Sequence, residues 1–128
     1  MAHAFGMTQC TLAPFFNGGD MLIATSHLDL LKNMQRYQPT FTVLIPMMLE
    51  FLYQRLRGMQ KRFPQLSKRE AAEKLFGHNL RYIGVGGAAS NADTVRAMLD
   101  YGITVRPGYG MTENAPMATV NLLQNPAQ

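Results

Sequence analysis

The chain has 128 residues, of which 47% are hydrophobic and 16% charged, and its formal net charge is +4. This length and composition are typical of one globular domain with enough apolar surface to form a core. No apolar run approaches the roughly 20 residues of a membrane span, and no basic segment followed by an apolar one marks a secretory signal at the start.

Strand signals recur along the chain as short apolar or β-branched runs. We expect strands at residues 21–24, 41–45, 81–85 and 103–105. Because these runs are apolar throughout, both faces of the sheet should be covered, which is typical of parallel strands. The predicted fold class is α/β, a three-layer unit with a parallel sheet of about four strands and helices on both faces.

Helix signals lie between the strand signals. Three capping boxes, in which a serine hydroxyl and a carboxylate satisfy free N–H groups, predict helices that begin after Ser26, Ser67 and Ser90. A fourth helix is expected from Met47 to Leu56, with Gly58 ending it and a loop over residues 59–66.

Two further features are interpreted from composition. The single cysteine, Cys10, cannot form an internal disulfide and lies in an apolar run, which favours an inert buried thiol and a reducing, cytoplasmic location. A cluster of cations from Arg55 to Arg69 is typical either of a nucleic-acid surface or of a solvated connector. The nearby Glu70 and Glu73 favour the connector, so we expect no nucleic-acid partner.

The most informative segment is Gly108 to Glu113, which reads GYGMTE and directly follows the run 103–105. Loops after strands are where open α/β sheets bind ligands. Its glycines permit close backbone approach, its ring can stack on a base, its hydroxyl can bond a phosphate and its carboxylate can hold Mg²⁺. The pattern predicts a nucleotide site; the alternative is a glycine-rich turn with a capping threonine and a solvated glutamate.

A second glycine segment, Gly84 to Ala89, follows a predicted strand and mimics the G-x-G-x-x-A motif of dinucleotide-binding folds. Those folds need an acidic residue at the end of the next strand to hold a ribose. Here that strand ends Val105-Arg106-Pro107, so a dehydrogenase is disfavoured. Neighbouring parallel strands would instead bring this segment beside GYGMTE.

Four segments together resemble the AMP-forming acyl- and aryl-CoA ligases of the adenylate-forming superfamily. They are Ala2–Gly6, Val43–Pro46, Val85–Ala89 and Gly108–Glu113, and they occur in that family's order and spacing. Ala89 stands where many members have proline. The resemblance covers nearly the whole chain and implies the central part of the large N-terminal domain of such a ligase.

The resemblance also implies a role for each matching residue. The nucleotide-binding residues would be Gly86, Gly87, Ala88, Gly108, Tyr109, Gly110, Met111 and Thr112. Among them Tyr109 would stack on the adenine and Thr112 would bond the α-phosphate. Glu113 would hold Mg²⁺, which makes Thr112 and Glu113 the catalytic candidates, and His3 would line the acyl pocket. The substrates would be ATP, coenzyme A and a fatty-acyl-type carboxylic acid.

The family's phosphate loop, its ribose-binding aspartate and its C-terminal domain with the catalytic lysine have no counterpart in the sequence. We therefore expect residues 1–128 to be a single partial domain with a frayed tail over 121–128, inactive alone and partnered by the rest of a ligase. Its first helix should expose apolar side chains that drive self-association, namely Phe5, Leu12, Phe15 and Phe16. The alternative is a non-catalytic nucleotide-binding or interaction module derived from the same fold.

Overall fold

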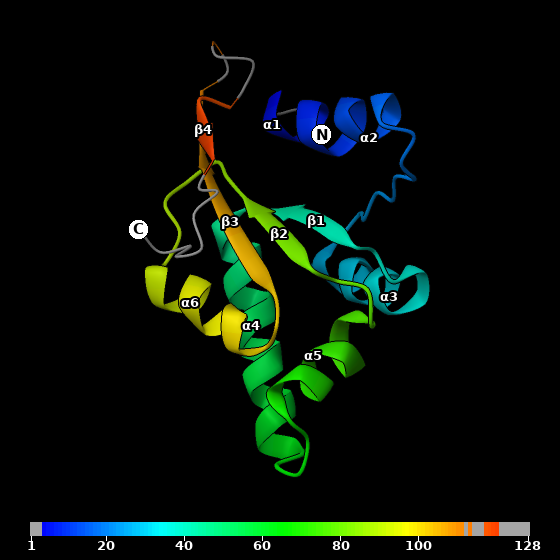
Figure 1. Cartoon of the computed structure of the whole chain (residues 1–128), viewed down its shortest axis with the longest axis vertical. Helices are drawn as coiled ribbons and strands as arrows, with labels where there is room; N and C mark the ends of the chain where they lie inside the picture. The colour runs from blue at the N-terminus through cyan, green and yellow to red at the C-terminus, as the bar shows by residue number, and fades with distance from the viewer. Residues whose placement is uncertain (1–3, 112, 114–116, 121–128) are drawn as a thin grey trace.

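A four-stranded sheet organises the computed structural model, which describes residues 4–111, 113 and 117–120 (Figure 1). The strands lie in the order β1 (Phe41–Leu44), β2 (Tyr82–Val85), β3 (Thr104–Tyr109) and β4 (Thr119–Val120). The first three are parallel, and β4 runs antiparallel to β3. The α/β class and the predicted number of about four strands are confirmed, but the sheet is not parallel throughout, because its fourth strand is the antiparallel β4.

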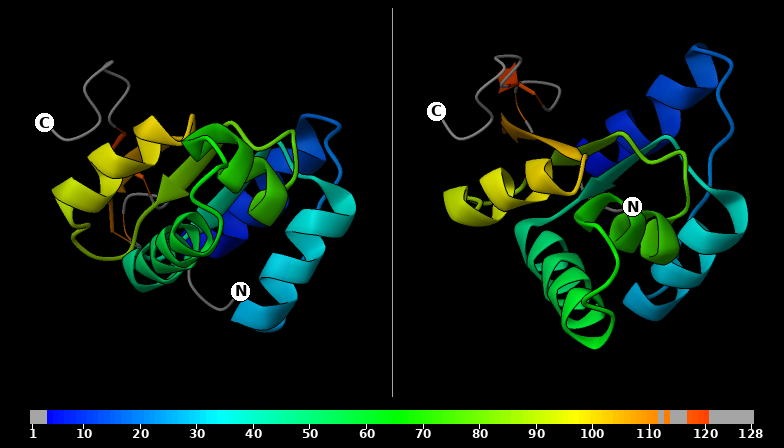
Figure 2. Two further views of the ribbon diagram at one scale, coloured as in Figure 1. Left: turned by 90° about the horizontal axis from the view of Figure 1, so that it is seen from below. Right: turned by 60° about the horizontal axis from the view of Figure 1, so that its bottom comes forward.

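Helices surround this sheet on two sides. The N-terminal helical segment comprises α1 (Ala4–Met7), the π-helical turn η1 (Thr8–Leu12) and α2 (Ala13–Phe16). The longer helices are α3 (His27–Tyr37), α4 (Pro46–Arg62), α5 (Lys68–Phe76) and α6 (Ala92–Asp100). Figure 2 shows α3 to α6 together on one side of the sheet, whereas η1 contacts β1 from the other side.

The core fills the space between the sheet and helices α4 to α6. Fully buried side chains come from β2 and β3, including Ile83, Val85 and Val105, and from the helices, including Leu52 and Phe76. The opposite face of the sheet is covered only in part. There Phe41 and Tyr82 remain 48% and 46% exposed.

The helix starts follow the predicted caps in two of three cases. Ser26 accepts a hydrogen bond from the Asp29 N–H, and Ser67 forms a complete capping box with Glu70. The third prediction was wrong by one residue. α6 is capped by Asn91 rather than Ser90, because the Asn91 side-chain oxygen reaches the free N–H groups of Asp93 and Thr94.

Two other predicted elements differ in the structure. Residues 21–24 do not form a strand, because they have no hydrogen-bonded neighbour in the sheet, and pairing rather than propensity makes a strand. α4 passes through Gly58 and ends at Arg62, so the predicted loop over 59–66 is shorter. A helical glycine costs only about 1 kcal/mol, which the burial of Leu52 and Leu56 on this helix offsets.

Gly77 ends α5 in a backbone conformation that demands glycine. Its φ and ψ are 87° and 168°, and a Cβ at this position would lie 2.8 Å from Cγ of Gln38. We therefore expect Gly77→Ala to lower the free energy of unfolding by about 1–3 kcal/mol, measured by urea denaturation.

Gly58→Ala is the matched control for this glycine substitution. A Cβ there meets no atom within 4 Å, and Gly58 lies inside α4. Alanine should stabilise that position by about 0.5–1 kcal/mol. Equal effects of the two substitutions would contradict the conformational argument.

Candidate nucleotide site at the ends of β2 and β3

The two glycine segments singled out from the sequence begin side by side. Strands β2 and β3 are paired so that Val85 lies opposite Pro107, and the two segments therefore follow directly from adjacent positions (Figure 1). At Gly108, a Cβ would lie 3.9 Å from the Val85 carbonyl oxygen and 3.5 Å from that of Thr119. The ends of β2, β3 and β4 therefore lie in van der Waals contact at this point.

The loop after β2 is anchored at its start and exposed beyond it. Gly86 is buried, and its N–H donates to the Leu44 carbonyl at 3.2 Å, which ties the loop to the end of β1. Gly87 has a φ of +89°, a conformation that favours glycine, and both Gly87 and Ala88 are exposed. The loop therefore offers an accessible backbone surface fixed to two strands.

Helix α6, which follows this loop, is held by a hydrogen bond to a residue far away in the sequence. The hydroxyl of Thr94, near the start of α6, donates to Oε2 of Glu50 on α4 at 2.7 Å. Gln54 donates to the other carboxylate oxygen at 2.7 Å, and these two bonds hold the pKa of Glu50 below its ordinary value. Sequence reasoning missed this pair, since 44 residues separate its members and no local pattern marks it.

The segment from Gly108 to Glu113 was predicted to begin a loop directly after the strand at residues 103–105. This prediction was wrong. Strand β3 continues to Tyr109 because β4 pairs with it, with Gly108 opposite Val120 and Tyr109 opposite Thr119. The N–H of Ala118 also donates to the Tyr109 carbonyl at 2.9 Å. This pairing fixes the backbone of Tyr109 while its side chain remains 65% exposed. The ring is thus exposed on a backbone held by strand pairing, where an aromatic face is available for stacking on a base.

Other predicted site residues are described only in part. Gly110, Met111 and Glu113 are exposed, and His3 and Thr112 lie outside the described residues. Within the described ranges no group of three or more His, Cys, Asp and Glu side chains is placed to hold a metal ion. A lone exposed carboxylate such as Glu113 suits a Mg²⁺ ion that takes its remaining ligands from substrate phosphates and water.

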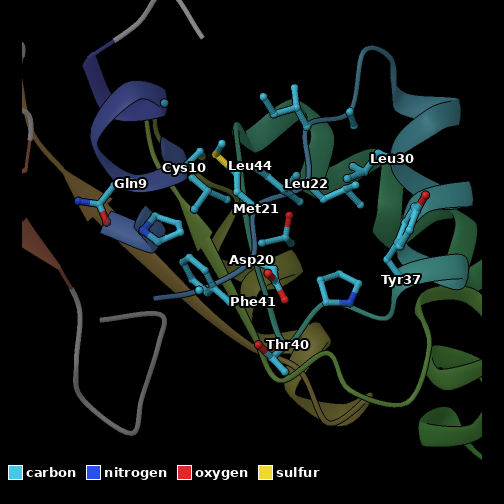
Figure 3. Close-up of a pocket in the computed structure, with 18 of the residues that line it drawn as sticks. Gln9, Cys10, Asp20, Met21, Leu22, Leu30, Tyr37, Thr40, Phe41 and Leu44 are labelled. Atoms are coloured by element: carbon cyan, nitrogen blue, oxygen red, sulfur yellow. The ribbon is translucent and has the colours of Figure 1, made fainter. Parts of the chain in front are cut away.

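A separate groove of about 860 Å³ lies at the other edge of the sheet, between the N-terminal helical segment, residues 19–26, α3 and β1 (Figure 3). None of the predicted nucleotide-binding residues that the structure describes lines it. Cys10 does; it is half-buried, not fully buried as predicted, and this burial raises the pKa of its thiol, which agrees with an inert cysteine. The groove and the paired glycine segments are therefore two distinct features.

Along the described part of the chain, no helix is long and apolar enough to cross a membrane.

The chain matches a known protein family over its whole length. The family model described as AMP-binding enzyme matches residues 1–128. A search of curated proteins found no match.

Several solved structures share the fold at low sequence identity. The anthranilate CoA ligase AuaEII, in complex with anthranoyl-AMP, superposes with a TM-score of 0.72 at 17% identity over 97% of this chain. The N-terminal domain of FACL13 from Mycobacterium tuberculosis gives 0.72 at 16% identity over 98% of it. The O-succinylbenzoate coenzyme A synthetase MenE from Bacillus subtilis, with ATP and magnesium ion, gives 0.66 at 20% identity over 93% of it. This chain spans 23%, 29% and 22% of those chains, respectively.

Proposed function

Because the chain belongs to the AMP-binding enzyme family, we propose that it forms the adenine side of the adenylation site of an AMP-forming acid–CoA ligase. The observation that carries this proposal is the pairing of β2 with β3. It places the end of β2, where the loop of Gly86–Ala88 begins, beside Gly108, and the pairing of β3 with β4 fixes the backbone of the exposed Tyr109. These are the groups that a purine needs: a backbone wall and an aromatic ring.

In the proposed reaction a carboxylate oxygen of the acid attacks the α-phosphorus of ATP. The bond from that phosphorus to the pyrophosphate oxygen breaks, and acyl-AMP and pyrophosphate form. The thiol of coenzyme A then attacks the acyl carbon, and AMP leaves with the bonding electrons. Donors placed where charge develops on the phosphate lower the barrier of the first step.

Each candidate residue has one part in this scheme. Tyr109 stacks on the adenine, and the hydroxyl of Thr112 donates to an α-phosphate oxygen. The carboxylate of Glu113 is the ligand for Mg²⁺, which offsets phosphate charge when bound. His3 lines the acyl side of the site. The acid is of fatty-acyl type, and the single cysteine agrees with a cytoplasmic location.

The rest of the ligase supplies what this chain lacks, since the chain spans only about a quarter of the relatives described above. We propose that the chain alone does not form acyl-AMP. The chain exposes apolar side chains that the rest of a ligase would cover. Leu12, Phe15 and Phe16 are 40%, 77% and 79% exposed. Apolar surface of this kind favours self-association when it is uncovered.

The role of Tyr109 is tested by titrating ATP into the chain and following the heat of binding. Stacking of a base on an aromatic side chain contributes about 1–3 kcal/mol, so Tyr109→Ala should weaken binding by roughly 5-fold to 150-fold. Tyr82→Ala is the matched control, because Tyr82 is also exposed but lies on the open face of the sheet.

Two results would contradict the proposal. One is ATP binding that Tyr109→Ala leaves unchanged, or that Tyr82→Ala weakens equally. The other is exchange of pyrophosphate into ATP by the chain alone with a fatty acid, which would show that the missing parts are not needed. ATP binding without any exchange in a complete protein would favour a non-catalytic nucleotide-binding module.

A further inference from the structure

Positive charge is concentrated in one short stretch of the chain. Residues 51–74 hold seven lysines and arginines against two glutamates, a net charge of +5, whereas the rest of the chain holds five against six, a net charge of −1. No acidic residue occurs from Phe51 to Arg69. The formal charge of the whole protein thus arises from this one stretch.

The fold gathers this stretch at one end of the molecule. The second half of α4, the turn over residues 63–67 and α5 form what we call the basic end. Figure 1 shows it on the opposite side from β4 and from the carboxyl ends of β2 and β3. A partner bound there would leave the candidate nucleotide site accessible.

Most cations of the basic end have no carboxylate partner. Lys68 pairs with Asp100 at 2.7 Å, and Arg69 pairs with Glu73 at 2.8 Å. Among the residues that the structure describes, the other five form no ion pair, although Arg57 is close enough to Glu50 to help lower the pKa of that carboxyl. All five are exposed: Arg55, Arg57, Lys61, Arg62 and Lys74. Their charges are therefore available to an anionic partner.

Three of these exposed cations lie over the faces of aromatic rings. The Arg55 guanidinium lies 5.1 Å from the ring centre of Phe51, and that of Arg57 lies 5.9 Å from Tyr53. The ammonium of Lys74 lies 4.5 Å from the ring centre of Phe63. All three rings are half-buried. A cation over a ring keeps its apolar stem on the protein and its charged head in water.

The position of the cations over half-buried rings favours lipid headgroups over single-stranded nucleic acid as the anionic partner. Single-stranded nucleic acid is held by exposed rings on which bases stack, and here cations lie over half-buried rings. Clusters of four to eight lysines and arginines on a helix are typical of contact with anionic lipid headgroups. The apolar face of α4 packs in the core, so the contact would be made by the exposed cations alone. We propose that the basic end binds an anionic phospholipid surface, with α4 and α5 facing the headgroups and the carboxyl ends of the strands facing water.

The experiment measures sedimentation of the 128-residue chain with vesicles. One set is phosphatidylcholine alone, and the other is phosphatidylcholine mixed with phosphatidylserine. The test variant replaces Arg55, Lys61 and Arg62 with glutamine. The matched control replaces Lys32, Arg36 and Arg96, which are exposed cations on α3 and α6, and leaves the same net charge. Circular dichroism of all three proteins verifies that they are folded.

We expect binding to the anionic vesicles only, with weaker binding as salt rises from roughly 0.05 M to roughly 0.5 M. Each cation near such a surface contributes about fivefold, so the test variant should bind on the order of 100-fold more weakly and the control much less so.

Three outcomes would overturn the proposal. An equal loss of vesicle binding in the test and control variants would show that binding depends on the net charge of the protein and not on the basic end. Equal binding to neutral vesicles would assign it to exposed apolar residues such as Phe15 and Phe16. Tighter binding to duplex DNA than to anionic vesicles, at equal total phosphate, would assign the basic end to nucleic acid.

Discussion

Replacing Glu113 with glutamine, within a complete ligase that contains this chain, should lower the rate of adenylation by about 100-fold to 1000-fold. The substitution keeps the shape of the side chain but removes a ligand of a hard cation and one group that stabilises charge in the transition state. Glu113 is exposed, so the free energy of unfolding should change by no more than about 0.5 kcal/mol. The measurement is exchange of pyrophosphate into ATP over a range of Mg²⁺ concentrations.

The Mg²⁺ series separates metal binding from other roles of Glu113. If the carboxylate holds the ion, raising Mg²⁺ should restore part of the lost rate, whereas Thr112→Val should reduce the rate without that response. Asp100→Asn is the matched control. Asp100 is an exposed carboxylate paired with Lys68 at the far end of α6, and its loss should leave the rate unchanged. Full activity of Glu113→Gln at low Mg²⁺ would show that GYGMTE is only a turn.

Replacing Phe76 with alanine should destabilise the fold more than Gly77→Ala does. Phe76 is the last residue of α5, is 0% exposed and belongs to the core between the helices and the sheet. Truncation removes its apolar contacts and leaves a cavity, with an expected loss of about 3–5 kcal/mol in the free energy of unfolding, measured by urea denaturation.

Phe15→Ala is the matched control for this loss. It makes the same chemical change at a side chain that is 77% exposed, and the expected loss for the monomeric chain at low protein concentration is no more than about 0.5 kcal/mol. A large effect at Phe15 would mean that this ring is covered in solution, as self-association through the N-terminal helical segment would require. A small effect at Phe76 would contradict the core described here.

Local patterns in the sequence predicted the three parallel strands and two of the helix starts that position the candidate site. The runs at 41–45, 81–85 and 103–105 became neighbouring parallel strands, because short β-rich runs separated by helices leave few other topologies. Ser26 and Ser67 cap helices as expected, since capping depends on residues only three positions apart. The same reasoning put the segments that contain Gly86 and Gly108 on neighbouring strands, although Gly108 lies within β3 and not in a loop after it.

Long-range contacts decided the rest. β3 extends to Tyr109 only because residues 119–120 return to pair with it, and residues 21–24 are no strand because nothing pairs with them. Helix α4 continues through Gly58 because burial of its apolar face outweighs the local preference of one glycine. The bond between Glu50 and Thr94 joins two helices that the sequence keeps 44 residues apart. Propensity acts over a few residues, whereas pairing and burial depend on which distant segments meet, and that is settled only in the tertiary structure.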